Sequence, residues 1–246
     1  MQTRLRLILC LFLIAASAVG LARMVAAEAM DGNDRVAGQC DPRLLLLEFF
    51  DGVTPPALPT GWSSTTWVTS NSGVPAPPAD TPPNAVFVDD PATISDKQLL
   101  SPTMVSLCDW GWVQVSFRNN FNLQDGFDGG VLEVSYDHGL TFQDILAAGG
   151  TFFVGGYNGT INSCCGNPLA SRQAWTGNSA GFIDTTVVNL PDGCVVDIIL
   201  RWRMGSDSSI SGEGWRIDNA NIVQCHAHFP PRPRDRPTPR PRPTSP

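Results

Sequence analysis

The chain has 246 residues and a net charge of −7, from 16 Lys or Arg and 23 Asp or Glu. The body between Met30 and His228 holds 8 Lys or Arg against 21 Asp or Glu, a balance of −13, whereas five arginines and one aspartate follow from Phe229 onward. A nucleic-acid surface needs a basic face, so the acidic body argues against nucleic acid as a partner. The length suffices for one β-sandwich with appendages.

The N-terminus has the pattern of a secretory signal peptide. Two arginines precede an apolar run over residues 7–21, and small residues follow it. Cleavage after Ala27 or Ala29 fits this pattern, so we expect residues 1–29 to be removed and the mature chain to be secreted or associated with the cell envelope. The apolar run is too short and too interrupted for a typical transmembrane helix. We therefore expect no membrane span after removal of the signal, with an uncleaved anchor as the alternative.

After removal of the leader, an even number of cysteines remains, which in an exported chain predicts disulfides. These cysteines are Cys40, Cys108, Cys164, Cys165, Cys194 and Cys225. Spacing alone does not choose among their pairings. A bridge between Cys40 and Cys225 would join the two ends of the domain, and the adjacent Cys164 and Cys165 could each bond elsewhere. Zinc is the alternative, although no CxxC or HxxxH spacing supports it.

Short strands separated by Gly, Pro and Asp turns are expected after the leader. Residues 30–42 are polar and predicted to be flexible, and the domain is predicted to cover residues 43–228. It opens with RLLLLEFF at 43–50, whose continuous leucines are typical of a strand buried on both faces or of a strand that crosses into the core. A proline-rich surface loop over 70–83 comes next. Further strands are then predicted over residues 84–89, 97–102 and 112–121.

The clearest element is a β-hairpin over residues 129–146. Apolar and polar residues alternate up to Ser135, a turn follows at Asp137-His138-Gly139, and a second strand begins at Thr141. The order Ser135-x-Asp137-x-Gly139 resembles an Asp-box, a hairpin turn in which an aspartate accepts backbone amide hydrogens. Sialidase-type propellers repeat this box once per blade, and here it occurs once. We therefore predict a rigid hairpin turn instead of a propeller.

The second half of the body is less regular at first. Residues 149–181 contain many glycines and the adjacent cysteines, and a loop of this length is either functional or disordered. With strands expected over 182–190, 194–205 and 214–225, the total reaches nine or ten. No amphipathic helix is evident, so the chain is predicted to be an all-β antiparallel sandwich. Residues 229–246, rich in Pro and Arg, are predicted to be a disordered tail, whose arginines could contact anionic cell-wall polymers or lipid head groups.

Three short motifs carry a family resemblance: EFFDG at 48–52, VLEVS-x-D-x-G at 131–139 and GWRIDN at 214–219. Together they resemble the MAM-like, concanavalin-type jelly-roll modules of secreted bacterial proteins, including the modules appended to immune-inhibitor-A-type metalloproteases. The resemblance covers about residues 43–225. It implies a jelly-roll sandwich and a non-catalytic role in adhesion, or in binding a glycan or another extracellular polymer.

The same resemblance implies a structural calcium where the first and last strands meet. The matching residues are Glu48, Asp51, Asp89 and Asp218. Calcium takes about six to eight oxygen ligands, which carboxylates and backbone carbonyls supply. The alternative is that Asp51 caps a turn and that Asp218 accepts backbone hydrogen bonds.

No catalytic residues are predicted. The HExxH motif is absent. A glycoside hydrolase on the same fold is the alternative, and it needs two carboxylates, for which Glu133 and Asp137 are the candidates. A cross-strand ion pair of Glu133 with Arg201 or Arg203 is the simpler interpretation.

Tryptophans offer the remaining clue to a ligand. Trp202 and Trp215 fall in strand patterns and are predicted to lie in the core. Trp110 and Trp175 lie near a turn or in the long loop, so they are the candidates for an exposed ligand surface. The chain is thus predicted to be a secreted, disulfide- and calcium-stabilised binding module for a glycan or a cell-surface polymer. A purely structural envelope protein, anchored by the tail, is a further alternative.

Overall fold

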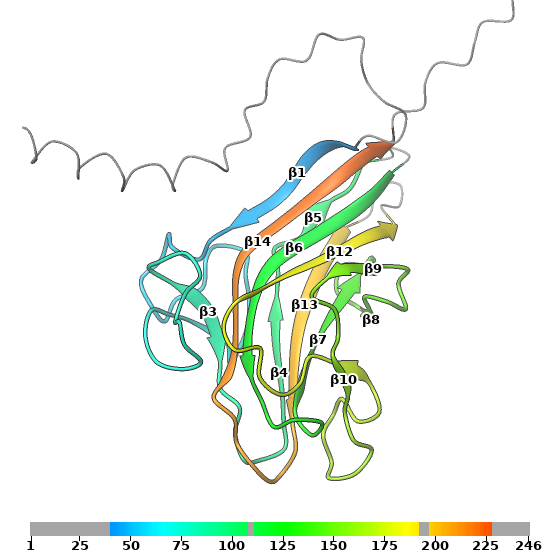
Figure 1. Ribbon diagram of the computed structural model, residues 1–246. Coiled ribbons are helices and arrows are strands. Elements are labelled where there is room, and N and C mark those ends of the chain that lie inside the picture. The colour runs from blue at the N-terminus through cyan, green and yellow to red at the C-terminus, as the bar shows by residue number, and fades with distance from the viewer. Residues whose placement is uncertain (1–39, 108–110, 192–196, 228–246) are drawn as a thin grey trace, which may run out of the picture. The chain divides into compact units, whose positions relative to one another are not determined.

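The computed structural model describes residues 40–107, 111–191 and 197–227, and these form strands and turns without a helix (Figure 1). All strand pairs are antiparallel, which confirms the predicted all-β sandwich. No helix in these ranges is long and apolar enough to cross a membrane. The predicted leader, most of the predicted flexible segment and the tail lie outside the described residues.

Seven strands form the larger sheet. Its order is β2 (Val68–Ser70), β3 (Ala85–Val88), β14 (Gly214–Ala227), β6 (Gly111–Asn122), β12 (Ile183–Pro191) and β9 (Thr151–Val154), and β1 (Cys40–Glu48) also pairs with β14. The first and last long strands therefore lie side by side. The register of β14 shifts between Asp218 and Asn221, where Asn219 has a φ of 51°.

The second sheet has five strands. Its order is β4 (Ser95–Leu100), β13 (Asp197–Ser206), β7 (Gly129–Ser135) and β8 (Gln143–Asp144), and β5 (Met104–Val105) also pairs with β13. A separate ribbon is formed by β10 (Gly159–Thr160) and β11 (Gln173–Ala174). The segment 149–181, predicted to be irregular, thus contributes three short strands. Two- to four-residue strands are too short to leave a periodic pattern in the sequence.

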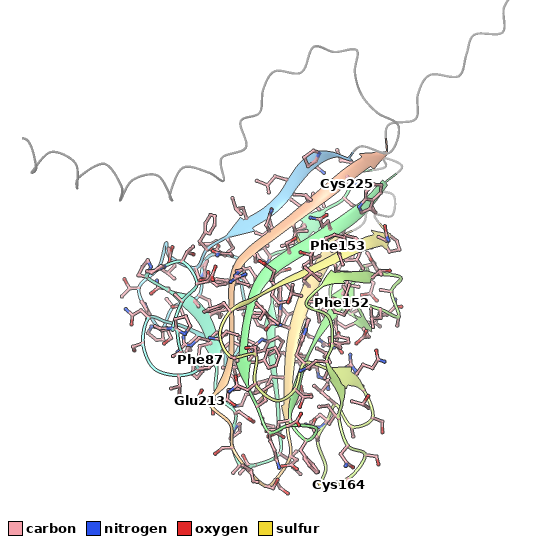
Figure 2. The ribbon with its side chains drawn as sticks, in the orientation of Figure 1. Phe87, Phe152, Phe153, Cys164, Glu213 and Cys225 are labelled. Atoms are coloured by element: carbon pink, nitrogen blue, oxygen red, sulfur yellow. A yellow bond between two sulfur atoms is a disulfide. The ribbon has the colours of Figure 1, made fainter. Side chains whose placement is uncertain are left out.

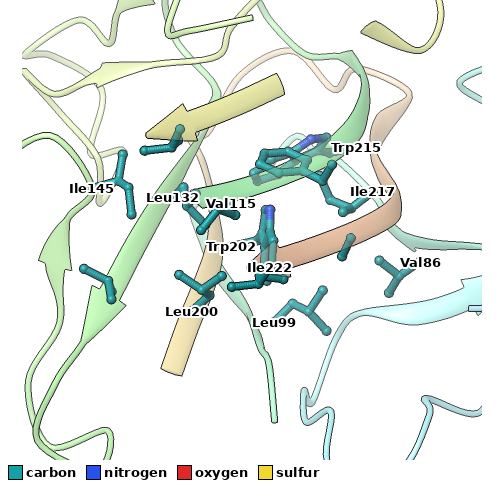
Figure 3. Packing of buried hydrophobic residues seen from close by; sticks show 14 of the residues in the cluster. Val86, Leu99, Val115, Leu132, Ile145, Leu200, Trp202, Trp215, Ile217 and Ile222 are labelled. Carbon is teal, nitrogen blue, oxygen red and sulfur yellow. The ribbon is translucent and has the colours of Figure 1, made fainter. Parts of the chain in front are cut away.

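Aromatic side chains fill the space between the two sheets. Trp202 and Trp215 are fully buried, as predicted, and Figure 3 shows them among aliphatic residues from both sheets. Phe117 packs edge-on against Trp202 with ring centroids 5.6 Å apart, and against Trp175 at 5.8 Å. Edge-to-face contacts of this kind add to the stabilisation from burial alone. The core is therefore built around aromatic rings in edge-to-face and tilted contact.

Two of the cysteine predictions can be compared with the structure. Cys164 and Cys165 form a disulfide with each other in the exposed β10–β11 loop, so they do not bond to distant partners. Cys225 is also disulfide-bonded, and Figure 2 shows it far from Cys164, near the other end of the domain. Cys108, Cys194 and the side chain of Cys40 lie outside the described residues, and the predicted Cys40–Cys225 pairing lies there with them.

Candidate ligand-binding face

Of the two tryptophans predicted for a ligand surface, Trp175 alone lies in the described residues, and Trp110 lies outside them. Trp175 is 0% exposed, and its indole N–H donates to the carbonyl of Gly155 at 2.9 Å. Its backbone exchanges two hydrogen bonds of 2.9 Å with Gly130, which draws the long loop onto β7. Trp175 is therefore a core residue, and its predicted exposure is corrected.

The four carboxylates predicted for calcium are held by other partners. In residues 40–107, 111–191 and 197–227, no three His, Cys, Asp or Glu side chains are arranged around one point as metal ligands. Glu48 Oε1 accepts the N–H of Phe50 at 2.7 Å, and Asp89 Oδ1 pairs with Lys97 Nζ at 2.7 Å. The first and last strands do meet, but these side chains bind neighbouring groups instead of one another.

Asp51 and Asp218 follow the structural alternative. Asp51 Oδ1 accepts the N–H of Asn84 at 2.9 Å. Asp218 is buried and accepts the N–H groups of Asp80 and Thr81 at 2.8 and 3.0 Å. Burial raises the pKa of Asp218 to about 6. Calcium at the four predicted residues stays a prediction, and the placement of these side chains does not support it.

The predicted hairpin turn is present between β7 and β8. In the antiparallel register of these strands, Glu133 lies opposite Asp144. In the turn, Asp137 Oδ1 accepts the N–H of Thr141 at 2.9 Å, and Ser135 Oγ accepts the N–H of Gly139 at 2.9 Å. Gly139 has a φ of 81°, a left-handed conformation that glycine adopts without steric cost. These bonds make the turn rigid.

We expect the carboxyl group of Asp137 to titrate near pH 2. The Thr141 hydroxyl, followed by the Thr141 N–H and the Ser135 hydroxyl, lowers the pKa of Asp137 from 3.8 to about 2. Because the folded-state pKa is the lower one, the contribution of this group to stability is present above about pH 4 and is lost as the pH falls toward 2. An NMR titration of the side-chain carboxyl measures the midpoint, and Thr141→Val should raise it. A midpoint of 3.8 in the wild type would contradict the described turn.

Charged and amide side chains cover part of the outer side of the second sheet. In β13, Leu200 and Trp202 point into the core, so Arg201 and Arg203 point outward. The register places Arg201 beside Glu133 of β7, and Arg203 beside Gln98 of β4. We call the resulting surface the arginine–glutamate face. It consists of Asp96, Gln98, Glu133, Asp144, Arg172, Arg201 and Arg203.

Glu133 is the centre of this face and is only 3% exposed. Its Oε1 accepts a hydrogen bond from Arg172 Nη1 at 2.5 Å, and its Oε2 accepts one from Arg201 Nε at 2.5 Å. Arg203 Nη1 lies 3.5 Å from Oε1. The predicted cross-strand ion pair of Glu133 with Arg201 is confirmed. A buried carboxylate with this many donors is fixed in place.

Each of the three guanidinium groups has a further contact that holds it in place. Arg203 forms a bidentate pair with Asp96 at 2.8 and 2.7 Å, and Arg172 Nη2 binds Asp144 at 2.8 Å. The guanidinium of Arg201 lies 3.9 Å from the centre of the Phe142 ring, a cation–π contact. All three arginine side chains remain partly exposed.

Arg172 is the residue that sequence reasoning missed. It immediately precedes β11, in the segment predicted to be irregular, and reaches Glu133 from 39 positions away. No local pattern indicates this contact. The face as a whole balances three arginines against three carboxylates and presents planar donors and acceptors on fixed strands. Such groups can bind a ligand rich in hydroxyl groups without first being reordered.

No protein-family model and no curated protein matches the sequence. Among solved structures, the carbohydrate-binding module TmCBM61 in complex with β-1,4-galactotriose is similar at 14% identity, over 71% of this chain and 98% of that chain, with a TM-score of 0.41. The CBM22-1 xylan-binding domain of Paenibacillus barcinonensis Xyn10C is 11% identical over 79% and 99%, with a TM-score of 0.42. The K2 cleaved adhesin domain of Lys-gingipain is 17% identical over 73% and 96%, with a TM-score of 0.39. At these identities and TM-scores, the similarity carries no argument about function.

Proposed function

We propose that this chain is a non-catalytic extracellular binding module, and that the arginine–glutamate face binds a glycan. The observation that carries the proposal is the fixed set of partly exposed polar groups on β4, β13 and β7. Sites on strands hold their geometry better than sites on loops. The ligand would meet side chains that already have the orientation needed for binding.

Charge and shape narrow the ligand class. Because the face has as many carboxylates as guanidinium groups, it offers no net attraction to a strongly anionic or cationic polymer. Guanidinium and carboxylate groups each present two parallel hydrogen-bonding positions. Two neighbouring hydroxyls of a sugar ring match this spacing, and the Phe142 ring beside Arg201 adds an apolar surface. A neutral polysaccharide is therefore the proposed ligand.

The same contacts disfavour the alternative of a glycoside hydrolase. Such an enzyme needs one carboxyl group that donates a proton and a second that acts as base or nucleophile. Both oxygens of Glu133 are occupied by arginines. Asp144, its neighbour across the hairpin, is bound by Arg172 and by the Tyr157 hydroxyl at 3.2 Å. Two carboxylates held by one guanidinium are poorly suited to transfer a proton.

Export is proposed from two observations. The first 29 residues have the pattern of a signal peptide. Cys164, Cys165 and Cys225 are oxidised to disulfides, which persist in extracellular and periplasmic compartments.

Binding of the oxidised mature chain to an array of neutral and acidic polysaccharides tests the proposal. We expect binding to at least one neutral glycan, and a loss of about tenfold in affinity, or about 1.4 kcal/mol, for Gln98→Ala. Gln98 accepts a hydrogen bond from Arg201 Nη1 at 3.2 Å and is half-buried on the face. Gln114→Ala is the matched control, because Gln114 is equally half-buried on β6 of the other sheet. No binding to any glycan, or equal losses in both variants, would overturn the proposal.

A further inference from the structure

A second polar cluster lies where the connections after β3, before β7 and after β13 meet. It contains Asp90, Asp128 and Asp207, which are 3%, 0% and 1% exposed. The backbone N–H of Asp207 donates to Asp128 Oδ1 at 2.6 Å, and this bond ties two of the connections together. Figure 1 shows the β6–β7 and β13–β14 connections at the same end of the sandwich. The cluster is separate from the arginine–glutamate face.

Each aspartate has one oxygen bound and one oxygen open. Gly212 N–H donates to Asp90 Oδ2 at 2.9 Å, and Ser209 donates through its N–H and its hydroxyl to Asp207 Oδ1, both at 2.7 Å. The second oxygens are buried and have no hydrogen-bond partner. These atoms are Asp90 Oδ1, Asp128 Oδ2 and Asp207 Oδ2. A buried acceptor without a donor is costly, and three in one place call for a missing partner.

The nearby charges do not supply that partner. Asp128 lies close to the negative charges of both Asp90 and Asp207. Lys97, whose positive charge acts on Asp90, donates instead to the side chain and the carbonyl of Asp89 at 2.7 and 3.0 Å. Neighbouring carboxylates repel each other, and a cation between them would remove this repulsion.

We propose that Asp90, Asp128 and Asp207 form a site for a divalent cation, with calcium as the preferred ion. The atoms that are free to bind a metal are all carboxylate oxygens, with no nitrogen or sulfur among them, and calcium prefers oxygen ligands. In the described residues these side chains do not surround one point, so they must adjust when the ion binds. The ion would fasten three connections at one end of the sandwich.

Thermal unfolding of the oxidised mature chain, with calcium chloride and then with excess chelator, tests the site. A ligand that binds only the folded state raises the Tm. We expect calcium to raise the Tm of the wild type by several degrees, and Asp128→Asn to abolish this rise. Asp218→Asn is the matched control, because Asp218 is an equally buried aspartate outside the cluster. In that variant the rise should persist.

Calorimetric titration of the wild type with calcium alone provides a second readout, which does not depend on the folding of any variant. Saturable binding to one site supports the proposal, and the absence of binding at millimolar calcium overturns it. A calcium-dependent rise that survives in Asp128→Asn, or that is lost only in Asp218→Asn, also overturns it. Because no glycan is present, failure here leaves the proposed function of the arginine–glutamate face unaffected.

Discussion

Replacing Arg216 by alanine is expected to lower the free energy of unfolding by about 3–5 kcal/mol. Arg216 is buried, and it donates to the carbonyls of Ser72, Val74, Pro75 and Pro78 at 2.6, 3.1, 3.1 and 2.9 Å. Burial lowers the pKa of Arg216 to about 10, which leaves it charged at neutral pH. Alanine would remove all of these donors at once. The carbonyls would then lack partners, because a proline-rich segment has few amide hydrogens of its own that could replace the guanidinium. Urea unfolding followed by tryptophan fluorescence measures the loss.

Arg118→Ala is the control for loss of an arginine. Arg118 lies opposite Asp218 on β6, is partly exposed, and pairs with Asp80 and Asp184 at 2.9 and 2.6 Å. Exposed ion pairs contribute little, so we expect a loss of about 1 kcal/mol. If both variants lost the same amount, the carbonyl contacts of Arg216 would not be the source of its effect.

A single methyl group on Gly130 is expected to destabilise the fold by about 2–3 kcal/mol or more. A Cβ at this position would lie 2.5 Å from Cζ3 and 2.7 Å from Cη2 of Trp215. That ring cannot move aside easily, because its N–H donates to Asn119 Oδ1 at 2.6 Å and it packs against Trp67 and Trp175. Gly130→Ala should therefore lower the Tm and weaken the near-ultraviolet circular dichroism of the tryptophans.

Gly52→Ala is the matched glycine control. A Cβ on Gly52 would meet no atom within 4 Å, so the change in stability should stay within about 0.5 kcal/mol. A Gly130→Ala variant as stable as the Gly52→Ala variant would show that the described contact with Trp215 is wrong.

Local patterns accounted for β6, β13 and the hairpin. Alternation of apolar and polar residues predicted β6 and β13, because one face of each packs on the core. The turn chemistry from Ser135 to Gly139 predicted the connection between β7 and β8. The alternation in β13 also predicted that Arg201 would point outward toward Glu133.

The sites depend on contacts between distant residues, and no sequence pattern reports them. Arg172 reaches Glu133 only because the long loop folds over β7. The same folding buries Trp175, whose glycine-rich surroundings had suggested exposure. Glu48, Asp51, Asp89 and Asp218 were predicted as calcium ligands from the family resemblance, which does not report their actual partners. Asp90, Asp128 and Asp207 lie in three separate connections, and only the folded structure brings them together.

The most direct test of the glycan proposal is an NMR titration of the mature chain with a soluble fragment of the best-binding polysaccharide. The NMR signals of the arginine Nε–H groups are the reporters. The Nε–H groups of Arg201 and Arg203 donate to Glu133 and Asp96, respectively, on the proposed surface. We predict saturable shifts of these two signals, with no change at Arg118 on the other sheet. Shifts confined to Arg118, or to residues away from the arginine–glutamate face, would contradict the account.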